Sequence, residues 1–187
     1  MKRVALVGMP NTGKSTLFNR LTGAHARVGN WPGITVDLLT AKLLVGNQMV
    51  ELVDLPGIYD LQGYSEDEKV VTTFLEQQRP DLLMLVINAA QLDRQLPLLM
   101  ALAALKLPLL VVLNMADEAK SLGITIDVPA LSQALGLQIC LLSAKFGHGM
   151  EQLQAAMRET LSQPLTLHAR PISPEAWTQA LRTHVQV

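Results

Sequence analysis

Four short apolar runs constrain the fold of this chain more than any other sequence feature. They occupy residues 3–7, 82–87, 109–113 and 137–142. The spacing between successive runs leaves room for a helix. Strands that are apolar along their length and separated by helices are typical of a parallel sheet covered on both faces. We therefore expect an α/β fold with a mostly parallel sheet.

Two further strands and a set of helices complete the predicted architecture. Residues 38–45 and 49–54 are joined by Gly46-Asn47, a dipeptide suited to a tight hairpin, so one strand should run antiparallel at the sheet edge. This makes a six-stranded sheet. Helical spacing with glycine or proline stop signals predicts five helices, at residues 14–21, 66–77, 92–105, 128–135 and 150–161.

The chain is expected to form one domain followed by a tail. Its 187 residues suit a single α/β domain. Composition changes at Ser162-Gln163-Pro164, which predicts a domain over residues 1–162 and a tail over residues 163–187. In the tail, Ser173-Pro174 resembles an N-cap with proline at the first helical position, and predicts a short helix to about His184.

Composition narrows the classes of function. With 15 Lys+Arg against 16 Asp+Glu, the formal charge is −1, so we expect no nucleic-acid partner. The single cysteine, Cys140, allows no disulfide within the chain and reads as a small buried residue in a reducing compartment. The apolar stretch after Lys2-Arg3 is too short for a signal peptide, which favours the cytoplasm.

The apolar segment 96–113 meets the length criterion for a transmembrane helix, with Lys106 as its only charge. Pro108 interrupts it, however. Leucines recur at helical spacing before the proline, and a short strand-like run follows it. The pattern favours a buried helix followed by a buried strand.

A phosphate-binding loop follows the first strand and precedes the first helix. Its sequence is Gly8-Met9-Pro10-Asn11-Thr12-Gly13-Lys14-Ser15. The spacing of glycines, lysine and hydroxyl residue matches the P-loop pattern. In such a loop backbone amides face the phosphates, Lys14 reaches the β and γ oxygens, and the Ser15 hydroxyl binds Mg²⁺.

The tetrapeptide Asp54-Leu55-Pro56-Gly57 ends the second strand of the hairpin. Alone, this sequence indicates only a turn. After a P-loop, it places the Asp54 carboxylate where it can hold Mg²⁺ through water, with the Gly57 amide free to meet the γ-phosphate.

Two motifs after later strands predict selection of guanine. Asn114-Met115-Ala116-Asp117 supplies a carboxylate that can accept two hydrogen bonds from guanine, which adenine cannot offer. In Ser143-Ala144-Lys145, the Ala144 amide can bond guanine O6 and the Lys145 stem can cover the base. His148, close by, reads as an exposed loop residue rather than a ligand.

These residues resemble the cytosolic G domain of bacterial FeoB ferrous iron transporters over residues 1–162. The P-loop through Asn19 is also shared in style by ribosome-assembly and tRNA-modifying GTPases. The discriminating stretch is Arg27-Val28-Gly29-Asn30-Trp31-Pro32-Gly33-Ile34-Thr35-Val36. The resemblance implies the P-loop GTPase fold, GTP/GDP and Mg²⁺ as ligands, and nucleotide contacts that include Pro10, Thr12, Thr16, Gly33 and Ile34.

By the same resemblance, Thr35 is the switch I threonine, which binds Mg²⁺, in a mobile loop of about residues 24–36. Trp31 either anchors this loop or stacks on the nucleotide, and we favour the anchor. The family also implies a K⁺ ion, which raises GTP turnover and is held by Asn11 and by backbone carbonyls near Gly29 and Trp31. Ile58 replaces the glutamine that orients water in Ras-type GTPases, so hydrolysis should be slow.

The resemblance further implies a membrane transporter region, in the same or an associated chain, and a location on the cytoplasmic face of the inner membrane. The chain is expected to be either a soluble fragment of such a protein or a naturally abbreviated protein, with the tail as the start of a helical regulatory domain. Oligomerisation is left open. Two alternatives remain: an RNA- or ribosome-associated GTPase, and a binding switch without meaningful turnover.

Replacing Asp117 tests the predicted choice of base. We expect Asp117→Asn to weaken GTP binding by several kcal/mol and to relax base selection, because buried polar groups lose their paired acceptor. Equilibrium titration with GTP and other nucleotides measures both effects. Unchanged GTP affinity in the variant would contradict the assignment.

Overall fold

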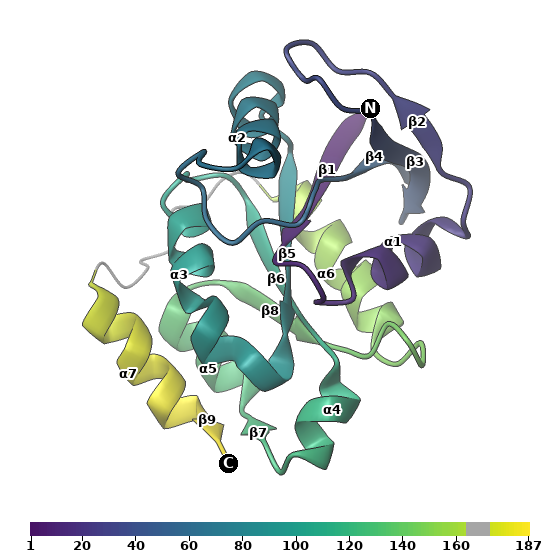
Figure 1. The fold of residues 1–187 in the computed structure, drawn as a ribbon. Coiled ribbons are helices and arrows are strands. Elements are labelled where there is room, and N and C mark those ends of the chain that lie inside the picture. Colours follow the sequence, from purple (N-terminus) through teal and green to yellow (C-terminus); the bar gives the residue numbers. More distant parts are fainter. Residues whose placement is uncertain (164–172) are drawn as a thin grey trace.

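The computed structural model describes residues 1–163 and 173–187, and confirms the predicted α/β class. The main strands are β1 (Lys2–Gly8), β2 (Arg27–Gly29), β3 (Leu38–Val45), β4 (Gln48–Asp54), β5 (Leu82–Asn88), β6 (Leu109–Asn114) and β8 (Gln138–Leu141). They form one seven-stranded sheet in the order β2-β3-β4-β1-β5-β6-β8 (Figure 1). A separate two-stranded sheet pairs β7 (Thr125–Ile126) with β9 (Val185–Gln186).

Helices cover both faces of the main sheet. They are α1 (Lys14–Thr22), α2 (Glu66–Gln78), α3 (Leu92–Ala103), α4 (Ala116–Ser121), α5 (Val128–Leu135), α6 (Met150–Ser162) and α7 (Pro174–His184), with a 3₁₀ helix, η1 (Ala89–Gln91), before α3. Residues of α2, α3, α5 and α7 contribute to one apolar cluster, and residues of α1 and α6 to the other.

The central strands are buried because these two clusters lie on opposite faces of the sheet. In β5, Leu83 and Leu85 belong to one cluster, whereas Leu82 and Met84 belong to the other. Every residue of β5 is buried. Each fully buried leucine contributes about 1.5–3 kcal/mol, which explains why these strands are continuous apolar runs.

The predicted hairpin is present, and the sheet extends one strand further. Strand β3 pairs antiparallel with β4, with Val45 opposite Gln48, so Gly46-Asn47 forms a two-residue turn in which Gly46 has φ +61°. Strand β2 then pairs antiparallel with β3 and becomes the edge. Its three residues are too few to show alternation, so the predicted six strands become seven.

The five predicted helices are α1, α2, α3, α5 and α6, and their ends agree with the predictions to within two residues. Helix α7 confirms the predicted tail helix, with the Ser173 hydroxyl accepting from the Ala176 amide. Helix α4 was not predicted. It has only six residues and follows Met115, whose left-handed φ of +62° hides the helix start from sequence patterns.

The apolar segment 96–113 divides between α3 and β6, as predicted. Among the helices in residues 1–163 and 173–187, none has the length and hydropathy needed to cross a bilayer. In the tail, α7 buries Trp177 in the cluster shared with α3 and α5. Residues 164–172 of the predicted tail lie outside the described residues. The boundary at residue 162 stays a prediction.

Cys140 lies buried in β8, as predicted. Burial removes water from the thiol and raises its pKa to about 11. Because the thiolate is the reactive form, this cysteine is inert at neutral pH and acts as a small apolar residue.

One buried side chain joins three loops at the carboxyl edge of the sheet. Asn114 ends β6 and is 3% exposed. Its Nδ2 donates to the Thr12 carbonyl, in the loop after β1, over 2.9 Å. Its Oδ1 accepts from the Ala144 amide, after β8, also over 2.9 Å. A Cβ on Gly13 would lie 2.3 Å from Nδ2, so only glycine fits beside Asn114.

Paired alanine substitutions test this contact. Gly13 and Gly63 have similar φ values, +81° and +78°, but a Cβ on Gly63 would meet nothing within 4 Å. We expect Gly63→Ala to lose about 1–2 kcal/mol of unfolding free energy from backbone strain alone. Gly13→Ala should lose about 1–3 kcal/mol more, because Asn114 is displaced from its buried partners. Equal urea midpoints for the two variants would show that the added methyl is accommodated.

Candidate nucleotide-binding site

The loop between β1 and α1 wraps closely and leaves the start of α1 open. Asn11 and Gly13 both have left-handed φ values, +64° and +81°. The Thr12 hydroxyl is turned inward and donates to the Met9 carbonyl over 3.1 Å. Helix α1 has no side-chain cap and no acidic residue in its first turn. Its free amides therefore present an anion-binding surface, as the P-loop pattern predicts.

Two close approaches explain glycines in this loop. A Cβ on Gly8 would lie 2.6 Å from the Val86 carbonyl oxygen of β5. A Cβ on Gly57 would lie 3.1 Å from the backbone nitrogen of Pro10. Both positions therefore need glycine, because a side chain there would collide with the backbone that packs around the loop.

Lys14 and Asp54, predicted to bind phosphate and Mg²⁺, are brought together by the structure. The Lys14 ammonium forms an ion pair with the Asp54 carboxylate and donates to the Leu55 carbonyl over 2.5 Å. The two side chains are 10% and 12% exposed. Ser15 and Thr16 lie exposed on the first turn of α1. A cation and a carboxylate thus meet at the first turn of α1, where Ser15 is exposed.

The segment after Asp54 is fastened to the P-loop through its backbone. The Ile58 amide donates to the Gly8 carbonyl over 2.9 Å, and Gly57 packs on Pro10. The Ile58 side chain is 1% exposed and lies in the apolar core. A buried alkyl group cannot orient water, which agrees with the predicted absence of that function here.

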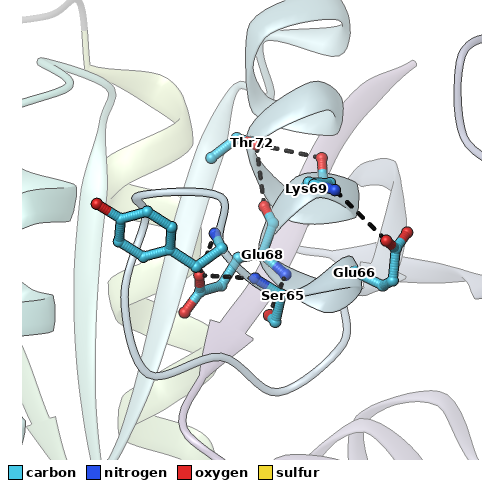
Figure 2. A network of polar contacts seen from close by, with 6 residues as sticks. Ser65, Glu66, Glu68, Lys69 and Thr72 are labelled. Carbon is cyan, nitrogen blue, oxygen red and sulfur yellow. Dashed lines mark hydrogen bonds and ion pairs between the residues drawn. The ribbon is translucent and has the colours of Figure 1, made fainter.

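Helix α2 begins with a capping box that fixes the end of this segment (Figure 2). The Glu68 carboxylate accepts from the amides of Tyr64 and Ser65, over 2.9 and 3.3 Å. In return, the Glu68 amide donates to the Ser65 hydroxyl over 3.1 Å. Tyr59 and Tyr64 are 66% and 84% exposed. The loop is thus anchored at both ends and exposed between them.

The predicted base-binding motifs lie side by side. Asp117 is in the first turn of α4, and the Ala116 amide donates to the Leu142 carbonyl over 3.1 Å. Ser143 is 2% exposed, and its hydroxyl has no hydrogen-bond partner. A buried hydroxyl of this kind is one that a polar ligand can pair with.

The loop after β8 differs from prediction in one contact. The Ala144 amide, expected to face guanine O6, donates to Asn114. Lys145 is exposed with its ammonium 5.3 Å from the Phe146 ring centroid, so its stem remains available. His148 is exposed, as predicted, and exchanges two 3.0 Å backbone hydrogen bonds with Ser143.

Switch I is held in place by Trp31. Trp31 packs edge-on against Phe74 of α2, with ring centroids 5.1 Å apart. The Arg3 guanidinium lies 4.6 Å from the Trp31 ring centroid. Arg3 is near the start of β1, about 16 Å along the strand from Gly8. Trp31 is therefore an anchor, the interpretation favoured from sequence. Thr35, four residues on, is exposed, and its predicted place at Mg²⁺ stays a prediction.

The predicted K⁺ ligands lie in two segments, the P-loop and the loop that begins at β2. Gly29 lies in the edge strand β2, and the Trp31 carbonyl accepts from the Ile34 amide over 3.1 Å. Gly33 has φ +74° and completes this turn. Trp31 lies against Arg3 near the start of β1, whereas Asn11 lies in the loop before α1. The potassium site stays a prediction.

Sequence patterns missed one residue of this edge. The Arg20 guanidinium, on α1, donates to the Ala144 and Lys145 carbonyls. No sequence signal points to it, because an arginine on a helix surface is ordinarily solvated. In residues 1–163 and 173–187, no group of three or more His, Cys, Asp or Glu residues could hold a metal ion by itself.

Sequence relatives agree on one family. A profile described as ferrous iron transport protein B matches residues 2–157. The Fe(2+) transporter FeoB of Synechocystis sp. is 51% identical over 164 residues, covering 87% of this chain and 27% of that protein. The Campylobacter jejuni FeoB is 44% identical over 151 residues, covering 81% and 25%. The chain thus spans about a quarter of the length of these relatives.

Solved structures show the same architecture. The cytosolic domain of the T. maritima FeoB iron transporter, in a GDP form, superposes with a TM-score of 0.85 at 35% identity, covering 92% of this chain and 67% of that one. The FeoB G-domain from Methanococcus jannaschii gives a TM-score of 0.77 at 38% identity, covering 87% and 100%. The chain therefore belongs to the FeoB family of ferrous iron transport proteins and has the P-loop GTPase fold of its cytosolic G domain.

Proposed function

We propose that this chain binds GTP, hydrolyses it slowly with K⁺ stimulation, and acts as a switch that regulates ferrous iron uptake by an attached membrane transporter. The observation that carries the proposal is the carboxyl edge of the sheet. There the open start of α1, the Lys14–Asp54 pair, Asp117 and the unpaired Ser143 hydroxyl lie around loops tied by Asn114.

Phosphate binding exchanges partners within a pair already in place. Lys14 and Asp54 neutralise each other, and both are nearly buried. A nucleotide offers phosphate oxygens to Lys14, and Ser15 and Asp54 are the residues that would hold Mg²⁺. The metal supplies positive charge that stabilises the negative charge developing on the phosphates. Because two charges are already desolvated, the site is prepared for this exchange at low cost in reorganisation.

Slow hydrolysis follows from the packing of Ile58. Its side chain belongs to the core, so water must be oriented by backbone groups such as the Gly57 amide. Charge stabilisation then falls to Lys14 and bound cations. The K⁺ role rests on the family resemblance of Asn11, Gly29 and Trp31, whose gathering requires switch I to leave its present anchor.

Regulation of iron uptake is proposed from the relatives, which are Fe(2+) transporters about four times the length of this chain. The partner would be a membrane transporter region of the same or an associated chain, with this domain on the cytoplasmic side. The alternative, a ribosome- or tRNA-associated GTPase, is disfavoured by the net charge of −1. Salt-sensitive ribosome binding would favour that alternative.

Phosphate release in matched salts tests the enzyme. We expect slow release of phosphate from GTP that requires Mg²⁺ and is faster in K⁺ than in Na⁺ at equal ionic strength. Asn11→Ala should abolish the difference between the salts while GDP binding persists. Equal rates in the two salts, or an unchanged K⁺ effect in Asn11→Ala, would contradict the cation role. If no phosphate is released over hours, the chain would instead be a binding switch without meaningful turnover.

The Trp31 anchor generates a second prediction. If switch I must leave Phe74 to bring Thr35 to Mg²⁺, the anchored state competes with GTP but not with GDP. Trp31→Ala should raise affinity for a non-hydrolysable GTP analogue by up to about tenfold, the free energy of one aromatic pair. Trp31→Phe, which keeps an aromatic ring, is the control. Equal changes for the analogue and GDP, measured by calorimetry, would show that the anchor is not coupled to the switch.

A further inference from the structure

One arginine connects the helix that starts at the phosphate site to the loop at the base site. Arg20 lies on α1, which begins at Lys14. Its Nε donates to the Ala144 carbonyl over 2.6 Å, and its Nη2 donates to the Lys145 carbonyl over 3.0 Å. One guanidinium therefore holds two successive carbonyls of the loop after β8, a geometry suited to its planar fork.

Both polar backbone groups of Ala144, its amide and its carbonyl, are bound by side chains. Asn114 binds its amide from the buried side, and Arg20 binds its carbonyl from α1. The next residue, Lys145, is exposed and has its carbonyl on the same guanidinium. Two side chains, the buried Asn114 and the exposed Arg20, therefore fix the loop at the predicted base position. Removing Arg20 leaves the Ala144 carbonyl with the Gly147 amide, 3.4 Å away, and leaves the Lys145 carbonyl at the exposed surface.

A glycine makes room for this contact. Gly147 has φ +71°, and a Cβ there would lie 2.9 Å from an Nη atom of Arg20. The turn after Lys145 thus packs directly on the guanidinium. Among residues 1–163 and 173–187, the ion pairs are Arg3–Glu51, Lys14–Asp54 and Lys69–Glu66, so Arg20 bonds to backbone carbonyls without a carboxylate partner.

We propose that Arg20 is a positioning residue for guanine-nucleotide binding: it holds the loop after β8 over the base and so sets the rate at which nucleotide leaves. This inference rests on the proposed function. Without Arg20 the loop keeps its Asn114 contact but samples arrangements in which Lys145 does not cover the base. Nucleotide must then select the covering arrangement, and it escapes more often when the loop opens.

The test is GDP dissociation from Arg20→Ala, Arg20→Lys and Arg158→Ala. A fluorescent GDP analogue is chased with excess GDP, and GTP turnover is measured at saturation. Arg158 is an exposed arginine on α6, beside Gly46 of the β3–β4 hairpin, and serves as the matched control. We expect dissociation from Arg20→Ala to be about tenfold faster, the effect of one to two net hydrogen bonds.

Two further comparisons make the test specific. One is the Arg20→Lys variant, and the other sets the GDP dissociation rate against the GTP turnover rate at saturation. Lysine keeps the positive charge but lacks the planar fork that fits two successive carbonyls, so Arg20→Lys should fall between the wild type and Arg20→Ala. Saturated turnover should stay unchanged, because the phosphate groups are untouched. Unchanged dissociation in Arg20→Ala, or a lowered urea midpoint without faster dissociation, would overturn the proposal. Failure of the wild-type chain to bind GDP would instead overturn the proposed function.

Discussion

The Asn114 amide group donates to the Thr12 carbonyl and accepts from the Ala144 amide while being 3% exposed, so each end of one side chain depends on the other. Its strand neighbour Asn88, level with it in β5, instead caps η1 through the Ala90 amide. Two buried asparagines at one sheet edge thus have different roles. Only that of Asn114 spans loops from different strands, and breaking either bond leaves a buried polar group unpaired.

The phosphate side is organised differently from the base side. At the base side, hydrogen bonds from Asn114 and Arg20 hold the loop after β8, and no ion pair takes part in these contacts. At the phosphate side, Lys14 and Asp54 satisfy each other, and switch I is fastened to Phe74 and Arg3. In the proposed function, guanine recognition needs little movement, whereas phosphate binding exchanges an ion pair and releases switch I. A γ-phosphate can drive that release only through contacts that GDP lacks.

Most elements were predictable because their signals are local. Burial on both faces makes apolar runs, and glycine or proline ends helices, so element ends agree to within two residues. Strand β2 and helix α4 were missed because three and six residues carry too little periodicity. The motifs assigned Lys14 to the phosphates and Asp54 to Mg²⁺. They could not predict that these two residues pair with each other, or that Asn114 accepts from the Ala144 amide, because such bonds depend on tertiary distance.

Residue 58 connects the packing of the core to the lifetime of the nucleotide states. Ile58 contributes its side chain to the core and its amide to the Gly8 carbonyl, so this position serves the fold and fixes the Gly57 peptide beside the P-loop. The same packing leaves it without a group to orient water. When hydrolysis is slow, the lifetime of each nucleotide state depends as much on release as on chemistry. Control then shifts to the base side of the site, where Arg20 joins α1 to the loop that covers the base. In the proposed function, the rate at which nucleotide dissociates from the base side sets the lifetime of each state.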